Sequence, residues 1–245
     1  YLAYKELMRK KLETQSGLKI IEGLVEELLF KSEKIVGIRT ENAEFIAKSV
    51  IVTTGTFLNG KIHRGKERIN AGRVAEPSAR RLSLCLSNKF LRLGRMKTGT
   101  PARLDKRTID WEKLDLQLGD KYPKKFSFWD TEIILPQVPC HIAYTNSITH
   151  KIISDNLSKS ALYGGEINGI GPRYCPSIED KVVKFADKKR HQIFLEPMGY
   201  SDESIMVYPN GLSTSLPIEI QYKFLRTIQG LEQVEIIEPG YAIEY

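Results

Sequence analysis

Residues 171–185 read GPRYCPSIEDKVVKF, a stretch in which glycine, proline, cysteine and a helix start occur together. In order, the residues are Gly171, Pro172, Arg173, Tyr174, Cys175, Pro176, Ser177, Ile178, Glu179, Asp180, Lys181, Val182, Val183, Lys184 and Phe185. Ser177 and Asp180 have the spacing of a capping box, which favours a helix beginning here. Ile178, Val182 and Phe185 then fall on one helical face. We therefore expect a short amphipathic helix.

The approach to this helix predicts an anion-binding site. Pro176 cannot continue a preceding helix, and Gly171 and Pro172 make an irregular entry. We expect the backbone N–H groups there to be free. Free amides and the positive end of a helix attract anions, such as the pyrophosphate of a dinucleotide or a phosphodiester.

Cys175 stands just before the helix start and two residues after Arg173. Both neighbours favour the thiolate, which is the form that attacks electrophiles. Glu179 and Asp180 act in the opposite direction. A small, buried, unreactive cysteine is the alternative interpretation. On these residues alone, both readings stay open.

The composition is that of a globular protein with a basic balance. The chain has 245 residues, 41% hydrophobic and 27% charged, with a formal net charge of +7 and an isoelectric point near 9.2. The charge makes a polyanionic partner plausible without locating it. No apolar run reaches the ~20 residues that a membrane span requires.

The cysteines and histidines predict neither a disulfide framework nor a metal site. Three widely spaced cysteines form no CxxC pair, which favours a reducing cytoplasm. Cys140 has no basic neighbour or helix start beside it, and we treat it as structural. The four histidines are scattered.

The first part of the chain predicts an α/β nucleotide-binding domain. A helix at 4–12 is followed by short apolar segments typical of strands, at 19–21, 25–30, 35–39, 45–47 and 50–53. This order indicates the later part of a doubly wound domain. Gly55 follows the last strand, where open α/β sheets bind ligands, and it would allow a cofactor to approach the backbone. An ordinary glycine turn is the alternative.

Two basic regions follow. Residues 62–81 carry seven basic side chains and little apolar periodicity, so we expect a surface loop that either contacts nucleic acid or is simply solvated. A second basic group lies at 92–107, around the turn Thr98-Gly99-Thr100-Pro101. Further on, residues 120–129 mix charged and aromatic side chains.

The rest of the chain predicts an inserted α/β domain. We expect strands at 138–144, 192–195, 205–208, 234–237 and 241–245, a helix capped by Thr149, and another starting near Ser215. The last two strands are expected to rejoin the first sheet. The predicted division is 1–96, then an insertion at 97–229, then a return at 230–245.

The opening stretch resembles the signature of the GidA/MnmG family, the tRNA uridine 5-carboxymethylaminomethyl modification enzymes. The resemblance continues through VTTGTFLNGKIHRG, GRMKTGTPARLDKRTID, HQIFLEP, YPNGLSTSLP and PGYAIEY, at 52–65, 94–110, 191–197, 208–217 and 239–245. These blocks span nearly the whole chain. We expect the chain to be an internal piece of a longer protein, lacking both termini and inactive by itself.

The resemblance implies cofactors, partners and site residues. It implies FAD, NADH, methylene-tetrahydrofolate as one-carbon donor, and glycine or ammonium, used to modify C5 of a tRNA wobble uridine. It implies a glutathione-reductase-like FAD-binding domain at 1–96 and 230–245 interrupted by an NAD-binding domain. Flavin contacts carry over to Val25 and to Ala79, the latter through its backbone, and they add to the cofactor contact expected at Gly55. NAD contacts carry over to Gly171 through Phe185. The implied partners are tRNA, the GTPase MnmE in a heterotetramer, and a second copy in a homodimer, in the cytoplasm.

Uracil C5 becomes nucleophilic when a group adds to C6, and a cysteine thiolate suits that addition. We assign this role, or that of acid and base, to Cys175. Arg173 would stabilise negative charge, and Tyr174 would stack or transfer a proton. The competing interpretation places the nucleophile on a cysteine outside this chain, with Cys175 lining the NADH site.

Three other functions remain open at this point. A related family uses folate and FAD to methylate C5 of a tRNA uridine, and a small-molecule flavin oxidoreductase would share the fold. A non-catalytic RNA-binding module would explain the basic residues without Cys175.

Overall fold

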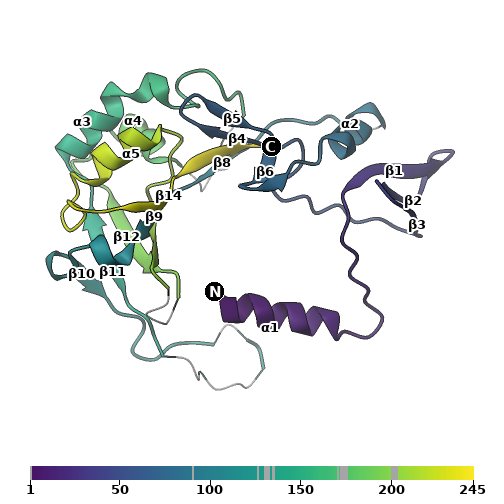
Figure 1. The fold of residues 1–245 in the computed structure, drawn as a ribbon, viewed down its shortest axis with the longest axis horizontal. Helices are drawn as coiled ribbons and strands as arrows, with labels where there is room; N and C mark the ends of the chain where they lie inside the picture. The colour runs from purple at the N-terminus through teal and green to yellow at the C-terminus, as the bar shows by residue number, and fades with distance from the viewer. Residues whose placement is uncertain are drawn as a thin grey trace. The chain divides into compact units, whose positions relative to one another are not determined.

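The computed structural model describes residues 2–89, 91–125, 127–129, 133, 136–169, 171, 176–199 and 204–245. Helices and sheets are both present, so the predicted mixed α/β class is confirmed (Figure 1). The chain divides into two compact units. The first unit comprises Tyr1–Gly99, Ala161–Cys175 and Ala242–Tyr245, and the second Thr100–Ser160 and Pro176–Tyr241.

The first unit begins with α1 (Leu2–Glu13) and a small antiparallel sheet. This sheet has the order β1 (Val25–Lys31), β2 (Lys34–Thr40) and β3 (Glu44–Ile46). Helix α2 (Arg80–Lys89) packs against β1. Leu28 of β1 and Leu82 and Leu86 of α2 share a buried apolar cluster with Ala79. This contact holds the three-stranded sheet to the helix.

A second sheet of the first unit joins segments far apart in the sequence. Its order is β5 (Glu67–Ile69), β4 (Lys61–Arg64), β15 (Tyr241–Glu244) and β8 (Lys97–Thr100). The last strand, β15, pairs antiparallel with β4. A short ribbon of β6 (Ala71–Arg73) and β7 (Glu76–Pro77) lies between β5 and α2 in the chain.

The second unit is built on a six-stranded sheet whose neighbouring strands all pair antiparallel. Its order is β10 (Asp115–Gln117), β11 (Cys140–Tyr144), β12 (Gln192–Pro197), β13 (Met206–Asn210), β9 (Arg103–Asp105) and β14 (Ile236–Glu238). The helices are α3 (Ser147–Asp155), α4 (Ile178–Lys184) and α5 (Ile218–Leu225), with 3-10 turns at Lys106–Thr108, Trp111–Lys113 and Leu157–Lys159. One large apolar cluster unites strands and helices.

Most predicted elements occur near their predicted places, but two predicted strands are wrong. Residues 19–21 and 50–53 are not strands. Ile20 is 58% exposed and Ile51 is 88% exposed. A strand needs a neighbour for its backbone groups, and none of the described strands pairs with these segments. The parallel sheet that a doubly wound domain requires is therefore not formed within the described residues.

Two other local predictions need correction. The N-cap of α3 is Asn146, whose side chain accepts the amides of Ile148 and Thr149, while Thr149 occupies the third helical position. Strand β14 pairs with β9 in the six-stranded sheet and does not rejoin the first unit. Only β15 returns there.

The two units differ from the predicted division. Residues 161–175 belong to the first unit, and the second unit continues to Tyr241 instead of ending at Gln229. Which cofactor each unit binds stays a prediction. Within the described residues, no helix combines the length and the apolar character that crossing a membrane requires.

Candidate functional site

Helix α4 begins as the sequence predicts. The Ser177 side chain accepts the Asp180 amide at 3.2 Å, and the Asp180 carboxylate accepts the Ser177 amide at 3.1 Å. Ile178 and Val182 face the core, whereas Phe185 is 46% exposed. The capping box is confirmed, and the predicted apolar face is shorter by one residue.

The amides of Ser177, Ile178 and Asp180 at this helix start are already bonded, whereas the free amides predicted for the approach before it fall mostly outside the described residues and stay a prediction. The amides of Ser177 and Asp180 serve the capping box, and the Ile178 amide donates to Ser213 O at 2.8 Å. Residues 177–180 are all buried. Burial forces polar groups to find partners inside the protein. The described end of α4 therefore offers no free amide at these three positions for a pyrophosphate.

Glu179 and Lys181 also serve the fold. The Glu179 carboxylate is fully buried and accepts the Thr214 hydroxyl at 3.1 Å and the Ser215 amide at 3.0 Å. The Lys181 ammonium donates to Gly211 O at 3.0 Å, and burial lowers the pKa of Lys181. Both side chains thus tie α4 to the loop after β13.

The residues assigned to catalysis lie outside the described residues. These are Arg173, Tyr174 and Cys175, together with Pro172 of the proposed NAD segment. The described members of that segment that are exposed are Gly171, Pro176, Val183, Lys184 and Phe185. NAD contacts along 171–185 stay a prediction. Among the described residues of this segment, only these exposed positions can contact a ligand without a rearrangement.

The structure brings together three of the regions predicted to meet the flavin. A cavity of about 230 Å³ is lined by Val25, Ala79 and the pair Thr53 and Thr54, with apolar side chains such as Leu28 and Val52. Thr53 and Thr54 immediately precede Gly55. Sequence reasoning did not single out Leu24, Ile38 or Leu82, which complete the wall. Their only signal is their apolar character.

Gly55 and Ala79 contribute in different ways. Gly55 has φ +53°, and a Cβ there would meet only Phe57, at 3.9 Å, so its backbone is open to a ligand. The Ala79 amide donates to Phe57 O at 2.8 Å, and its carbonyl accepts the Asn59 amide at 3.3 Å. The backbone N–H and C=O of Ala79, through which the flavin contact is predicted, are therefore already hydrogen-bonded within the chain. Its methyl group remains available as cavity wall.

These residues fit one portion of a flavin dinucleotide. Pockets that enclose a whole drug-sized ligand have volumes of about 300–1,000 Å³, and this cavity is smaller. Its apolar lining suits a ring system, and the two threonines supply hydroxyl groups. The described residues are thus compatible with one part of the predicted flavin site.

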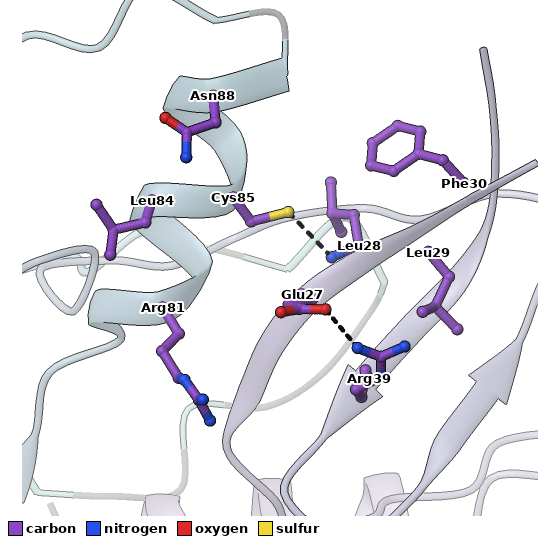
Figure 2. A pocket seen from close by; sticks show the side chains of 9 residues that line it. All are labelled: Glu27, Leu28, Leu29, Phe30, Arg39, Arg81, Leu84, Cys85 and Asn88. Carbon is purple, nitrogen blue, oxygen red and sulfur yellow. Dashed lines mark hydrogen bonds and ion pairs between the residues drawn. The ribbon is translucent and has the colours of Figure 1, made fainter. Parts of the chain in front are cut away.

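A second, open hollow of about 510 Å³ lies between β1, β2 and α2 (Figure 2). Cys85 of α2 points toward β1, and its sulfur accepts the Leu28 amide at 3.4 Å. Arg39 bonds to Glu27 at 2.6 Å, and Arg81 bonds to Glu26 at 2.6 Å. The charged groups around the hollow are thus paired with each other, and the thiol is engaged.

Cys140 is a poor candidate nucleophile, which agrees with its predicted structural role. Burial, with a smaller contribution from Glu196, raises the pKa of the Cys140 thiol. A raised pKa keeps it in the unreactive thiol form. Within the described residues, no group of three His, Cys, Asp or Glu side chains is placed to hold a metal ion.

The basic region at 62–81 is not the predicted loop. It contains β4, β5, β6, β7 and the start of α2. Most of its guanidinium groups form ion pairs, namely Arg64 with Glu67, Arg68 with Glu166, Arg73 with Glu76 and Arg81 with Glu26. Paired arginines have less charge to offer a phosphate backbone.

The second basic group is similarly engaged. Arg107 pairs with Asp105 at 2.6 Å and Arg95 with Glu244 at 3.7 Å. Arg103 lies 4.5 Å from the centre of the Tyr208 ring. Lys97 is 2% exposed. Neither basic region therefore presents a row of unpaired cations.

His63 is the most strongly perturbed titratable group of the first unit. Its ring is fully buried on β4. Burial, reinforced by Arg68, lowers the pKa of His63 to about 4, although Glu244, whose carboxylate lies 3.7 Å from Nε2, acts in the opposite direction. The imidazole is therefore neutral at physiological pH, and its protonation in acid is expected to lower the free energy of unfolding.

Comparison with known proteins identifies relatives along the whole chain. A family profile described as glucose inhibited division protein A matches residues 2–245. The chain is 53% identical over 245 residues to the tRNA uridine 5-carboxymethylaminomethyl modification enzyme MnmG of Thermodesulfovibrio yellowstonii, covering 100% of this chain and 39% of that protein. Its identity to the protein of the same name from Aquifex aeolicus is 53% over 251 residues, covering 99% and 40%.

A solved structure has the same fold. The form I crystal structure of Aquifex aeolicus GidA matches with a TM-score of 0.89 and 53% sequence identity, covering 99% of this chain and 41% of that one. The chain thus spans about two fifths of the length of these relatives.

His63 predicts a loss of stability in acid. Its pKa is about 4 in the folded protein and about 6.5 in an unfolded chain. Between these values the unfolded state binds more protons, so the free energy of unfolding falls as pH drops from about 6.5 toward 4. The shift corresponds to about 3 kcal/mol. Urea unfolding at a series of pH values, with His63→Phe alongside, measures it.

The variant lacks this titration, so its stability should depend less on pH over the same range. An equal pH dependence in both proteins would show that another group is responsible.

Proposed function

Because this chain belongs to the glucose inhibited division protein A (GidA) family, we propose that it is part of an FAD- and NADH-dependent enzyme that modifies tRNA. The enzyme installs a carboxymethylaminomethyl-type group on C5 of the wobble uridine. Methylene-tetrahydrofolate supplies the carbon, and the GTPase MnmE is the partner. The protein acts in the cytoplasm as a homodimer, and with MnmE it forms a heterotetramer.

The observation that carries this proposal is the identity over the complete chain. Two relatives named as tRNA uridine 5-carboxymethylaminomethyl modification enzymes are each 53% identical to it over essentially all of its length. Their name specifies tRNA and the modified base, which favours this function over C5 methylation or a module without catalysis. The activity belongs to the whole protein, of which the chain represents about two fifths.

In the proposed enzyme, the first unit contributes to a doubly wound FAD-binding domain and the second carries the NAD-binding insertion. Val25, Thr53, Thr54 and the Ala79 methyl group would enclose one part of the flavin, and Gly55 would admit it to the backbone. Bound FAD supplies the redox chemistry of the one-carbon unit. The protein residues position it and exclude water from the apolar wall.

The proposed nucleophile precedes an immobilised helix start. Cys175 is followed by Pro176 and then by Ser177, whose amide and hydroxyl are held by Asp180. The thiolate adds to uridine C6, and the electron pair of the C5–C6 double bond moves to C5, which then forms a bond to the carbon derived from methylene-tetrahydrofolate. Glycine or ammonium supplies the nitrogen bonded to that carbon in place of the folate nitrogen. Loss of the C5 proton then restores the C5–C6 double bond and expels the thiolate from C6. Arg173 stabilises the negative charge on the ring, and Tyr174 stacks on it or transfers a proton.

The flavin assignment predicts that a larger side chain at Ala79 blocks the cofactor. In the full-length protein, Ala79→Phe fills the cavity wall, and the flavin-to-protein ratio should fall to about a tenth or less. Absorbance at the flavin band measures it. Ala79→Ser nearly keeps the size of the wall and serves as the control, while Leu84→Phe places the same aromatic side chain at an exposed site of α2. Normal flavin content in Ala79→Phe would remove this cavity from the cofactor site.

The assignment of Cys175 predicts that Cys175→Ser in the full-length enzyme loses at least about a hundredfold in modification rate. Flavin content and tRNA binding should stay unchanged, since the residue is placed in chemistry and not in folding. Nucleoside analysis of the tRNA product measures the modification and distinguishes it from C5 methylation.

Cys140→Ser is the matched control and should keep its activity. Turnover near that of the wild type in Cys175→Ser would exclude Cys175 from the chemistry and favour a nucleophile outside this chain. A wild-type protein that binds tRNA but leaves the wobble uridine unmodified would contradict the proposed function itself.

A further inference from the structure

A long excursion at 118–139 joins β10 to β11, which are neighbours in the six-stranded sheet of the second unit, and the structure describes 118–125, 127–129, 133 and 136–139 of it (Figure 1). The excursion leaves β10 at Gln117 and returns to β11 at Cys140, and these two residues are register partners. Close to these two residues, Gly119 on the outgoing segment of the excursion lies beside Gln137 on the returning one: a Cβ at Gly119 would be 2.7 Å from the Gln137 side chain. The base of the excursion is therefore held together. Connections of this length inside a compact domain are uncommon and are usually either functional or linkers, so the side chains of the excursion decide between the two.

The excursion exposes large aromatic side chains. Tyr122 is 81% exposed, Phe128 is 106% exposed and Trp129 is 82% exposed. Aromatic rings of this size normally contribute to a core or an interface, because burying them stabilises the protein strongly. Three solvent-exposed aromatic side chains within a span of eight residues therefore indicate a binding surface.

Lysines accompany the rings. Lys121, Lys124 and Lys125 are all exposed, and the Lys121 ammonium lies 5.5 Å from the centre of the Tyr122 ring. Between positions 121 and 129 the sequence contains no acidic and no aliphatic side chain. The nearest acidic residues, Asp120, Asp130 and Glu132, stand outside these limits in the sequence. The rings and the positive charge thus occupy the same short segment.

This combination fits nucleic acid better than protein. Protein interfaces use aromatic residues too, but lysine is depleted at them. Proteins that bind single-stranded nucleic acid combine cations for the phosphates with aromatic rings on which bases stack. In double-stranded RNA the base faces are covered by neighbouring pairs, and recognition passes through the backbone and the minor groove. Rings on an irregular loop therefore suit unpaired bases.

We propose that Tyr122, Phe128 and Trp129, with Lys121 and Lys124, form a stacking platform for unpaired bases of an RNA. The proposal rests on the function proposed above, because the wobble uridine lies in the unpaired loop of the tRNA anticodon arm. The bases beside that uridine are the expected occupants. Stacking there holds the loop open while the target base reaches the reaction site.

The test uses the full-length protein and two RNAs, an anticodon stem-loop and a blunt duplex of equal length. The double variant Phe128→Ala/Trp129→Ala should bind the stem-loop at least about tenfold more weakly, since each stacked base contributes substantially to affinity. Its affinity for the duplex should change little. Tyr4→Ala, which removes an exposed aromatic ring from α1, is the matched control and should bind as the wild type does.

A second variant tests the lysines. Lys121→Gln/Lys124→Gln should weaken binding of both RNAs and reduce the slope of log affinity against log salt concentration by about one to two. Fluorescence anisotropy at several salt concentrations measures both effects.

Other outcomes overturn the proposal. Unchanged stem-loop affinity of the double variant would do so directly. A lower melting temperature or loss of flavin would show that the rest of the protein covers the rings, and a change from dimer to monomer would show that a second copy does. No RNA binding by the wild type would overturn this inference and the proposed function together. Ring-dependent stem-loop binding without uridine modification would leave the inference standing and contradict only the proposed function.

Discussion

The second unit depends on how it pairs the polar groups that it buries at the start of α4. Glu179 carries a carboxylate at a fully buried position, and Thr214 and Ser215 donate to it. Both donors bond Oε1, whereas Oε2 has no hydrogen-bond partner within the described residues. Because leaving a buried polar atom without its hydrogen bonds costs about 1–3 kcal/mol, these bonds hold the helix start to the loop at 213–215. Ser177 and Asp180 close the same corner from the other side. The corner is therefore a fixed scaffold, and the residues proposed for the chemistry, 173–175, precede it in the sequence.

The same rule governs the chain's return toward the first unit. The buried Gln221 of α5 donates to the carbonyls of Leu216 and Gly240 and accepts the Gly240 amide at 2.8 Å. One amide side chain thus fixes the backbone just before β15. In contrast, the surfaces proposed to bind flavin and RNA carry apolar or aromatic groups that the described chain leaves exposed, such as Ile51 and Trp129. Hydrogen bonds between buried polar groups thus hold the rigid parts of the fold, whereas exposed aromatic and aliphatic side chains form the candidate ligand-binding surfaces.

These physical differences explain what the sequence could predict. The capping box of Ser177 and the short apolar segments that become β1 and β2 are local patterns, and the structure contains them. The segment at 50–53 is apolar enough for a strand, but strand formation also needs a partner, which no local pattern supplies. The basic residues and weak apolar periodicity of 62–81 predict a loop. The region nevertheless contains a hairpin, because β4 pairs with β5 and Arg64 forms an ion pair with Glu67 across the turn. The bonds of Glu179 to Thr214 and Ser215 connect positions too distant for a pattern in the sequence to reveal.

The central claim is that a thiol just before this scaffold attacks the uridine. An RNA that carries 5-fluorouridine at the wobble position tests it most directly, because fluorine at C5 prevents the proton loss that would release the added thiol. After incubation of the full-length enzyme with this RNA and its cofactors, peptide mapping by mass spectrometry should place the nucleotide adduct on Cys175. An adduct on any other cysteine, formed while Cys175 remains unmodified, would contradict the account.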